Sequence, residues 1–388
     1  MLFKKIFNIN LTKTVLRLCL LFICLSICSA CQSDVKVINI GYIGPLTKRA
    51  TDLGIGPANA LKIAVEEYNR NKKPEEPVVN LFIEDDQWEK DNAIITYEKL
   101  RREQDINIIF ISNSEGTIAI SDKALEDGVI LVNPLNNDAL LSKLNSNTFK
   151  IAKSTEQANS LIAIRIIELG LKKVAIMNYP NDFMTIASTS CKKLLDKNGI
   201  KNKIVTINKE ATDFEKELKS FKKEGYDAYV FFGYKNFGFA MKQARELGIT
   251  APFFGSTVLL DPAYYENSQG TIVGTECTFF TPADGNWVLA NEFLDTYKLT
   301  YGEKPFSVWP PLQAYDAMNL VLNEVKTIND TKNSDQYFDE WLRQRLNNVK
   351  FFQGTCGNIS IGKNGASKGI YFSLYNYESK GSLIKVKR

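Results

Sequence analysis

A strand–helix–strand pattern in the first third of the chain constrains its fold more than any other feature. Two short apolar runs, residues 106–112 and 129–132, are rich in β-branched side chains. Each run is too short for a free-standing helix, so each predicts a buried strand. Residues 115–127 lie between them, have helical length and place Ile118 and Leu125 on one face. Two strands joined in this way are parallel neighbours in a sheet, because parallel strands need such a crossover.

A polar segment directly follows each of these two predicted strands. Residues 113–117 read Asn-Ser-Glu-Gly-Thr, and residues 136–138 read Asn-Asn-Asp. In open parallel sheets, ligands bind beyond the carboxyl ends of the strands. We therefore expect the two segments to lie at one edge of the sheet and to contribute to a binding site.

The alternation of strand and helix extends over both halves of the chain. Strands are predicted at residues 35–42, 78–83, 106–112, 129–132, 173–177, 203–207, 228–232 and 252–254. The pattern occurs twice without a repeat of fixed period, so it indicates an α/β protein of two similar lobes, each with a doubly wound parallel sheet. Residues 359–361 and 370–375 are predicted to form two further strands joined by a turn.

Composition excludes several classes of chemistry. The chain has 388 residues, enough for two domains, and it contains no histidine. A histidine base, a Ser–His–Asp triad and histidine metal ligands are therefore excluded. The cysteines Cys191, Cys277 and Cys356 have spacings that fit no metal motif, and we expect most of them to be buried free thiols. We expect no metal, no cofactor and no enzymatic activity.

The first thirty residues are typical of a targeting segment. They contain four basic residues and no acid, and residues 18–30 form a mostly apolar run of signal-peptide length. The run ends in Cys-Ser-Ala before Cys31, which resembles a bacterial lipoprotein signal that is lipidated at that cysteine. The alternative is a secretory signal cut near Ala30. The rest of the chain has 44 basic and 44 acidic residues, so no nucleic-acid partner is expected.

Several segments carry a resemblance to a known family by their order and spacing. They are VKVINIGYIGPL at 35–46, AVEEYN at 64–69, EDD at 84–86, VAI at 174–176, FGY at 232–234, KQARELG at 242–248 and AYDA at 314–317. In this order, the chain from about residue 35 resembles the type I periplasmic binding proteins of the leucine/isoleucine/valine group, which are solute receptors of ABC importers.

This resemblance implies two lobes joined by a three-crossover hinge, with a ligand in the cleft on which the lobes close. One lobe would comprise residues 31–151 and 279–369, and the other residues 152–278 and 370–388. It also implies an ABC transporter permease as partner and a location in the periplasm or at the cell surface. A lipid on Cys31 would hold the protein to the bilayer.

Six ligand contacts follow from the resemblance, position by position. They are Ser114, Leu135, Asn137, Phe183, Tyr234 and Thr257. Ser114 matches a serine that holds the ligand carboxylate, although as a helix N-cap it could serve only the backbone. Asn137 could instead be a turn residue, and the two aromatic residues could belong to the core.

Thr257 bears on the class of ligand, because the amino-acid receptors have an acid there that pairs with the ligand ammonium. An unpaired buried charge is costly, so we hypothesise a carboxylate or amide ligand without an α-ammonium. Alternatively, Glu115 or Asp138 supplies the charge and the ligand is an ordinary amino acid. A second class of function stays open, in which a lipoprotein of this fold binds no solute and acts as a sensor through protein partners.

Overall fold

The computed structural model describes residues 36–208, 210–280, 285–328, 337–362, 364–380 and 382–386. The predicted signal segment, with Cys31, lies outside the described residues. In the part of the chain that is described, no helix has both the length and the apolar composition needed to cross a membrane.

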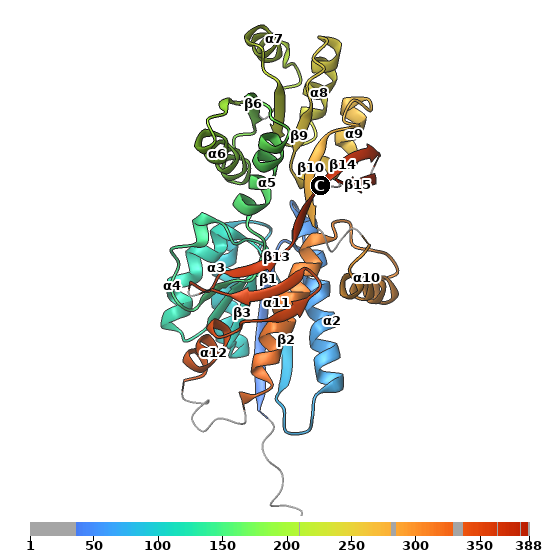
Figure 1. The fold of residues 1–388 in the computed structure, drawn as a ribbon. Helices are drawn as coiled ribbons and strands as arrows, with labels where there is room; N and C mark the ends of the chain where they lie inside the picture. The colour runs from blue at the N-terminus through green and yellow to red at the C-terminus, as the bar shows by residue number, and fades with distance from the viewer. Residues whose placement is uncertain are drawn as a thin grey trace, which may run out of the picture.

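A five-stranded parallel sheet, in the order β2-β1-β3-β4-β5, forms the first of two large α/β bodies. Its strands are β1 (Val37–Gly44), β2 (Val78–Asp85), β3 (Ile108–Ile111), β4 (Ile130–Asn133) and β5 (Thr148–Lys150). Every residue of β3 and β4 is buried, because helices cover both faces of the sheet. We call the part of the chain around this sheet the first lobe (Figure 1).

The two faces of this sheet have separate cores. On one face, α3 (Lys90–Gln104) and α4 (Ser114–Glu126) pack on alternate strand residues such as Ile109. On the other face, α2 (Ile55–Asn71) and α11 (Trp309–Val325) pack on the residues between them, such as Phe110. The first lobe also contains α10 (Val288–Tyr301) and α12 (Phe338–Asn347).

A seven-stranded sheet, in the order β15-β14-β10-β9-β8-β6-β7, forms the second lobe. The parallel strands are β6 (Lys173–Asn178), β7 (Lys201–Thr206), β8 (Ala228–Phe232), β9 (Phe253–Gly255) and β10 (Glu276–Phe280). The antiparallel strands β14 (Phe372–Ser379) and β15 (Ser382–Lys385) extend this sheet at one edge.

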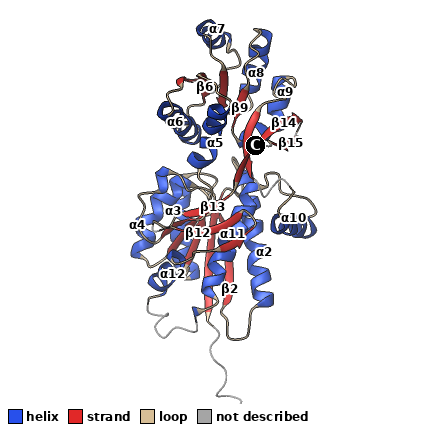
Figure 2. Cartoon of the chain, in the orientation of Figure 1, coloured by secondary structure: helices blue, strands red, loops and turns tan. Residues whose placement is uncertain are grey.

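Helices also cover both faces of the second sheet (Figure 2). The helices α5 (Thr155–Glu168) and α6 (Asp182–Lys197) pack on one face. The helices α7 (Glu215–Glu224), α8 (Phe237–Glu246) and α9 (Pro262–Ser268) pack on the other. The eight strands predicted up to residue 254 are all present, with ends shifted by at most two residues. The prediction of an α/β fold with two doubly wound sheets is confirmed.

The strand predicted at residues 359–361 is present, whereas the one predicted at 370–375 covers the end of one strand and the start of the next. The strands β11 (Phe352–Gly354), β12 (Gly357–Ile361) and β13 (Ser367–Ile370) form a separate three-stranded antiparallel sheet. After β13 the chain leaves this sheet at Tyr371 and enters the seven-stranded sheet as β14. The sequence Ser-Lys-Gly-Ile of β13 has almost no apolar pattern, so the sequence does not separate it from the apolar strand that follows.

The helical face shared by Ile118 and Leu125 is not the buried face of α4, because these residues are 41% and 40% exposed. The helix buries small residues instead, including Gly116 and Ala124. A Cβ atom at Gly116 would lie 2.8 Å from the Cβ of Ala93, so α3 and α4 approach closely there. Small residues permit this approach, and they also weaken the apolar pattern that marks a buried face.

The chain passes between the two lobes in three places. The passages lie between β5 and α5, between β10 and α10, and between β13 and β14. In the first, Ala152 donates its N–H to the Ser367 hydroxyl at 3.0 Å, and this hydroxyl donates to the Ala152 carbonyl at 2.8 Å. The first passage is thereby tied to the segment that leads into the third.

Candidate functional site

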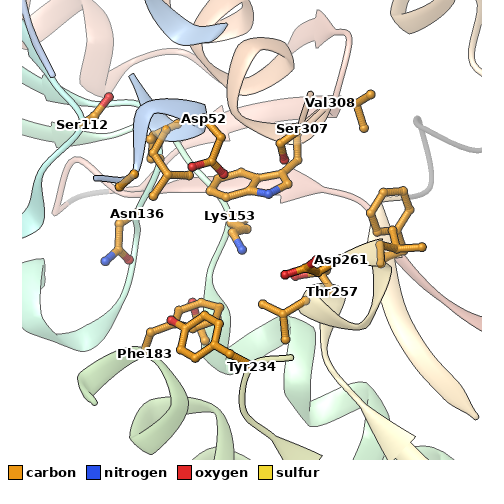
Figure 3. Close-up of a pocket in the computed structure, with 18 of the residues that line it drawn as sticks. Asp52, Ser112, Asn136, Lys153, Phe183, Tyr234, Thr257, Asp261, Ser307 and Val308 are labelled. Atoms are coloured by element: carbon orange, nitrogen blue, oxygen red, sulfur yellow. The ribbon is translucent and has the colours of Figure 1, made fainter. Parts of the chain in front are cut away.

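A cleft of about 1530 Å³ lies between the two lobes and receives residues from both. The first lobe contributes Ser114, Leu135 and Asn136, which follow β3 and β4. The second lobe contributes Phe183 and Tyr234, which follow β6 and β8. The carboxyl ends of parallel strands therefore face the cleft from both sides, as expected for ligand sites in open α/β sheets (Figure 3).

Five of the six residues proposed from the sequence line this cleft. They are Ser114, Leu135, Phe183, Tyr234 and Thr257. The sixth, Asn137, is not among the lining residues, and its side-chain amide donates to the Ser367 carbonyl at 2.9 Å. Asn136 faces the cleft in its place.

The turn after β4 explains this difference of one position. The Asn133 side-chain oxygen accepts from the backbone N–H groups of Leu135 and Asn136, at 3.0 and 2.8 Å. Asn136 then donates its side-chain amide to the Ser114 hydroxyl at 2.9 Å. Such side-chain turns are common for asparagine, but the sequence Asn-Asn does not show which amide faces the cleft.

Ser114 is not the N-cap of α4. Asn113 caps the helix, because its side-chain oxygen accepts from the N–H groups of Glu115 and Gly116, at 3.0 and 3.2 Å. The Ser114 hydroxyl accepts from Asn136 and keeps its own hydrogen to donate. A hydroxyl donor in the first turn of a helix suits an anionic group, since the helix dipole favours negative charge there.

Neither aromatic residue of the second lobe is fully buried, although Phe183 packs against the core of that lobe. Tyr234 is 38% exposed, and its ring meets that of Tyr179 edge to face at 4.9 Å. Its hydroxyl accepts from the Asn181 amide at 3.1 Å. Phe183 is half-buried at the start of α6. Both rings offer apolar surface to the cleft.

Lys153 lines the cleft and is a residue that sequence reasoning missed. It lies in the passage between β5 and α5, and it is only 5% exposed. Its ammonium lies 4.2 Å from the ring centre of Trp309 and 5.2 Å from that of Phe183. Burial lowers the pKa of Lys153 to about 8, while the charge of Asp138 acts in the opposite direction. The sequence signal is a single lysine after Ile-Ala and directly before the Ser154 helix cap.

The two acids considered from the sequence as ammonium partners both line the cleft. Asp138 is 2% exposed, and one carboxylate oxygen accepts from the Thr155 N–H at 2.6 Å. Burial raises the pKa of Asp138, and the hydrogen bonds from Thr155 oppose this effect. Glu115 is exposed at the start of α4. Three further acids line the cleft, namely Asp52, Asp182 and Asp261.

Within the described part of the chain, no group of three or more Cys, Asp or Glu side chains is placed to hold a metal ion. Cys191, Cys277 and Cys356 are buried free thiols, as predicted. Burial raises the pKa of Cys191 and Cys277 to about 12. The residues that line the cleft offer hydrogen-bonding groups, charges and apolar surface.

Comparisons with known proteins agree with this architecture. A family model described as periplasmic binding protein matches residues 37–380. No curated protein sequence matches the chain significantly. Among solved structures, the leucine binding protein LivK of Thermotoga maritima has 21% identity and a TM-score of 0.73, with 90% of this chain and 98% of that chain covered.

Two further solved structures have similar folds. LivJ of Streptococcus pneumoniae, in complex with isoleucine, has 22% identity and a TM-score of 0.71, with 90% of this chain and all of that chain covered. A solute binding protein of R. palustris, in complex with benzoate, has 17% identity and a TM-score of 0.70, with 90% and 95% covered. The family model matches most of the chain, and the similar fold covers 90% of it, so this chain belongs to the periplasmic binding protein family.

Proposed function

We propose that the protein is the extracytoplasmic solute receptor of an ABC importer. It binds an amino acid or a related small carboxylate or amide in the cleft and performs no chemistry on it. The observation that supports this proposal is the cleft itself, which both lobes line with residues at the carboxyl ends of their strands. Binding of the solute changes the relative position of the two lobes, and the transporter permease recognises this change.

The size of the cleft supports closure of the lobes on the ligand. Pockets for drug-sized ligands have volumes of about 300–1,000 Å³, whereas this cleft has about 1530 Å³. A small solute fills such a space only when the lobes approach one another. We propose that the first lobe, expected as residues 31–151 with 279–369, and the second lobe, expected as residues 152–278 with 370–388, rotate about the three passages. Because β10 ends at Phe280 and β13 at Ile370, the second and third passages begin one or two residues after these expected boundaries.

We propose that five of the residues expected from the sequence contact the solute directly. Ser114 donates to a carboxylate or carbonyl oxygen, and Leu135, Phe183 and Tyr234 enclose the apolar body. Thr257 offers a neutral hydroxyl from the second lobe. Asn137 acts through the hinge, because its amide binds the Ser367 carbonyl and its N–H binds the Lys153 carbonyl.

We propose that a lipid on Cys31 anchors the receptor to the bilayer after removal of residues 1–30. The support is the sequence alone, a basic segment and a thirteen-residue apolar run that ends at this cysteine. An anchor would keep the receptor close to its permease at the periplasmic or outer surface of the membrane.

Thermal unfolding of the purified full chain tests the proposal. A solute that binds only the folded protein stabilises it by about 2.7 kcal/mol at a hundredfold excess over Kd. The panel comprises L-amino acids, their deaminated carboxylates and the corresponding amides. We expect at least one solute to raise the melting temperature in a saturable way. The same solute should reduce the radius of gyration measured by small-angle X-ray scattering. No shift with any member would favour the sensor that binds no solute.

A further inference from the structure

The ammonium of Lys153 is the feature of the cleft that most restricts its ligand. The side chain is 95% buried, and its ammonium lies between the Trp309 ring of the first lobe and the Phe183 ring of the second. Among the described residues, this ammonium has no hydrogen bond and no ion pair. Aromatic faces attract a cation only modestly. A buried cation in such surroundings gains strongly from contact with an anion.

The backbone holds Lys153 in this position from two sides. Its N–H donates to the Gln313 side-chain oxygen at 2.5 Å, and its carbonyl accepts from the Asn137 N–H at 3.0 Å. Gln313 belongs to α11, and Asn137 to the turn after β4. Two separate parts of the first lobe therefore fix the passage that carries Lys153, and the side chain points into the space between the lobes (Figure 3).

The carboxylates that line the cleft do not form an ion pair with Lys153, so its ammonium can bind an anionic ligand. Asp138 acts on Lys153 through space, but its carboxylate is bound to the Thr155 N–H and makes no ion pair with the ammonium. Asp261 accepts from the Ala263 N–H as the cap of α9. The remaining charged groups that line the cleft are Arg49, Asp52, Glu115, Asp182 and Lys385.

We propose that Lys153 is the anion-binding residue of the cleft and that the solute is a small carboxylate with an apolar or aromatic body and no α-ammonium. This inference rests on the proposed function and narrows its ligand class. In an α-amino acid, a single carbon atom separates the ammonium from the carboxylate. A carboxylate bound at Lys153 would therefore bring its own ammonium against a second cation, which like-charge repulsion disfavours.

The surroundings of Lys153 suit the rest of such a solute. Trp309 and Phe183 flank the ammonium, and Leu135 and Tyr234 line the same cleft. Because these side chains come from both lobes, closure would remove water from the ion pair and strengthen it. The bound anion would then lie between the two lobes, so that movement of either lobe would change its contacts with the protein.

Two matched series of probes test the inference by isothermal titration of the full chain at pH 7. One series is 3-phenylpropanoate, 3-phenylpropanamide and L-phenylalanine, and the other is 4-methylpentanoate, 4-methylpentanamide and L-leucine. Within a series the body is constant and only the charges differ. A charge-assisted hydrogen bond contributes about 1.5–3 kcal/mol, so we expect a carboxylate to bind on the order of 10- to 100-fold more tightly than its amide and its amino acid.

Three variants assign this preference to Lys153. Lys153→Met should abolish the preference for carboxylate over amide, and Lys153→Arg should restore part of it. Lys201→Met, which removes a lysine charge from the exposed start of β7, is the matched control and should behave as the wild type. Titrations at pH 8 in buffers of different ionisation enthalpy should show proton uptake with the carboxylate, and none in Lys153→Met.

The outcomes separate this inference from the proposed function. Binding of leucine or phenylalanine without binding of the carboxylates would overturn the inference and leave a solute receptor in place. Equal affinity of the carboxylates for the wild type and Lys153→Met would also overturn it. Failure of every probe in both series would count against the inference and the proposed function together. If a variant does not fold, the affinities of the wild type for the carboxylate, the amide and the amino acid still test the inference.

Discussion

Replacing Lys153 by methionine should stabilise the protein while it removes the binding of anions. The two side chains have similar length, and methionine suits a position between two aromatic rings. The lysine has a pKa of about 8 in the folded protein, against an ordinary value of 10.5. A pKa shift of one unit corresponds to 1.36 kcal/mol, so the buried charge costs at most about 3 kcal/mol of folding free energy below pH 8.

The stability gained by Lys153→Met should depend on pH, because the lysine loses its charge at different pH values in the folded and unfolded chains. Between about pH 8 and 10.5 the unfolded chain binds more protons at this position than the folded chain, so wild-type stability from this group rises with pH. The cost is fully present at pH 7 and falls to about 1 kcal/mol at pH 10 by the same linkage relation. The advantage of Lys153→Met should therefore shrink by about 2 kcal/mol between these two pH values.

Equilibrium urea denaturation of both proteins at pH 7 and pH 10 measures this change. Lys150 is also buried and its pKa is also lowered to about 8, but it is present in both proteins and cancels in the difference. Lys153→Arg keeps its charge throughout this range and should show no such gain. The reasoning would be refuted if Lys153→Met were less stable than the wild type at pH 7. It would also be refuted if the difference in free energy of unfolding between the two proteins were the same at both pH values.

Other predictions follow from the cleft, the thiols and the N-terminus. Ser114→Ala should weaken the binding of a carboxylate probe about tenfold, in line with the loss of one hydrogen bond to a charged group, and should leave the melting temperature within a degree or two; unchanged affinity would remove Ser114 from the site. Cys191, Cys277 and Cys356 are buried, so a thiol reagent should not modify them in the native protein and should do so in urea; rapid native labelling would contradict their placement. Cys31→Ser should move the protein from the membrane fraction to the soluble fraction, and continued membrane association would exclude lipidation at this residue.

Local sequence patterns predicted the secondary structure and the region of the cleft. Runs such as Ile108–Ile111 are entirely buried, and this burial is what gives a strand between two helical layers its continuous apolar sequence. The polar residues after such strands are at the same edge of the sheet for a topological reason, because parallel strands end on the same side. Ser114 and Tyr234 could therefore be assigned to the cleft without any knowledge of distances.

Features that depend on the rotation of one turn, or on partners far apart in the chain, could not be predicted in this way. A turn built on the Asn133 side chain decides that Asn136 rather than Asn137 faces the cleft. The three-dimensional path of the chain decides that β14 joins the second sheet rather than pairing with β12.

Lys153 shows most clearly what tertiary structure adds. Its sequence neighbours predict only the start of a helix, whereas its environment comes from Phe183 on α6 and Trp309 on α11. Burial and charge pairing depend on all the atoms around a group, and those atoms belong to segments that folding alone brings together. A lysine in a sequence is a solvated cation by default, and only the packing of the two lobes around it makes it a buried one.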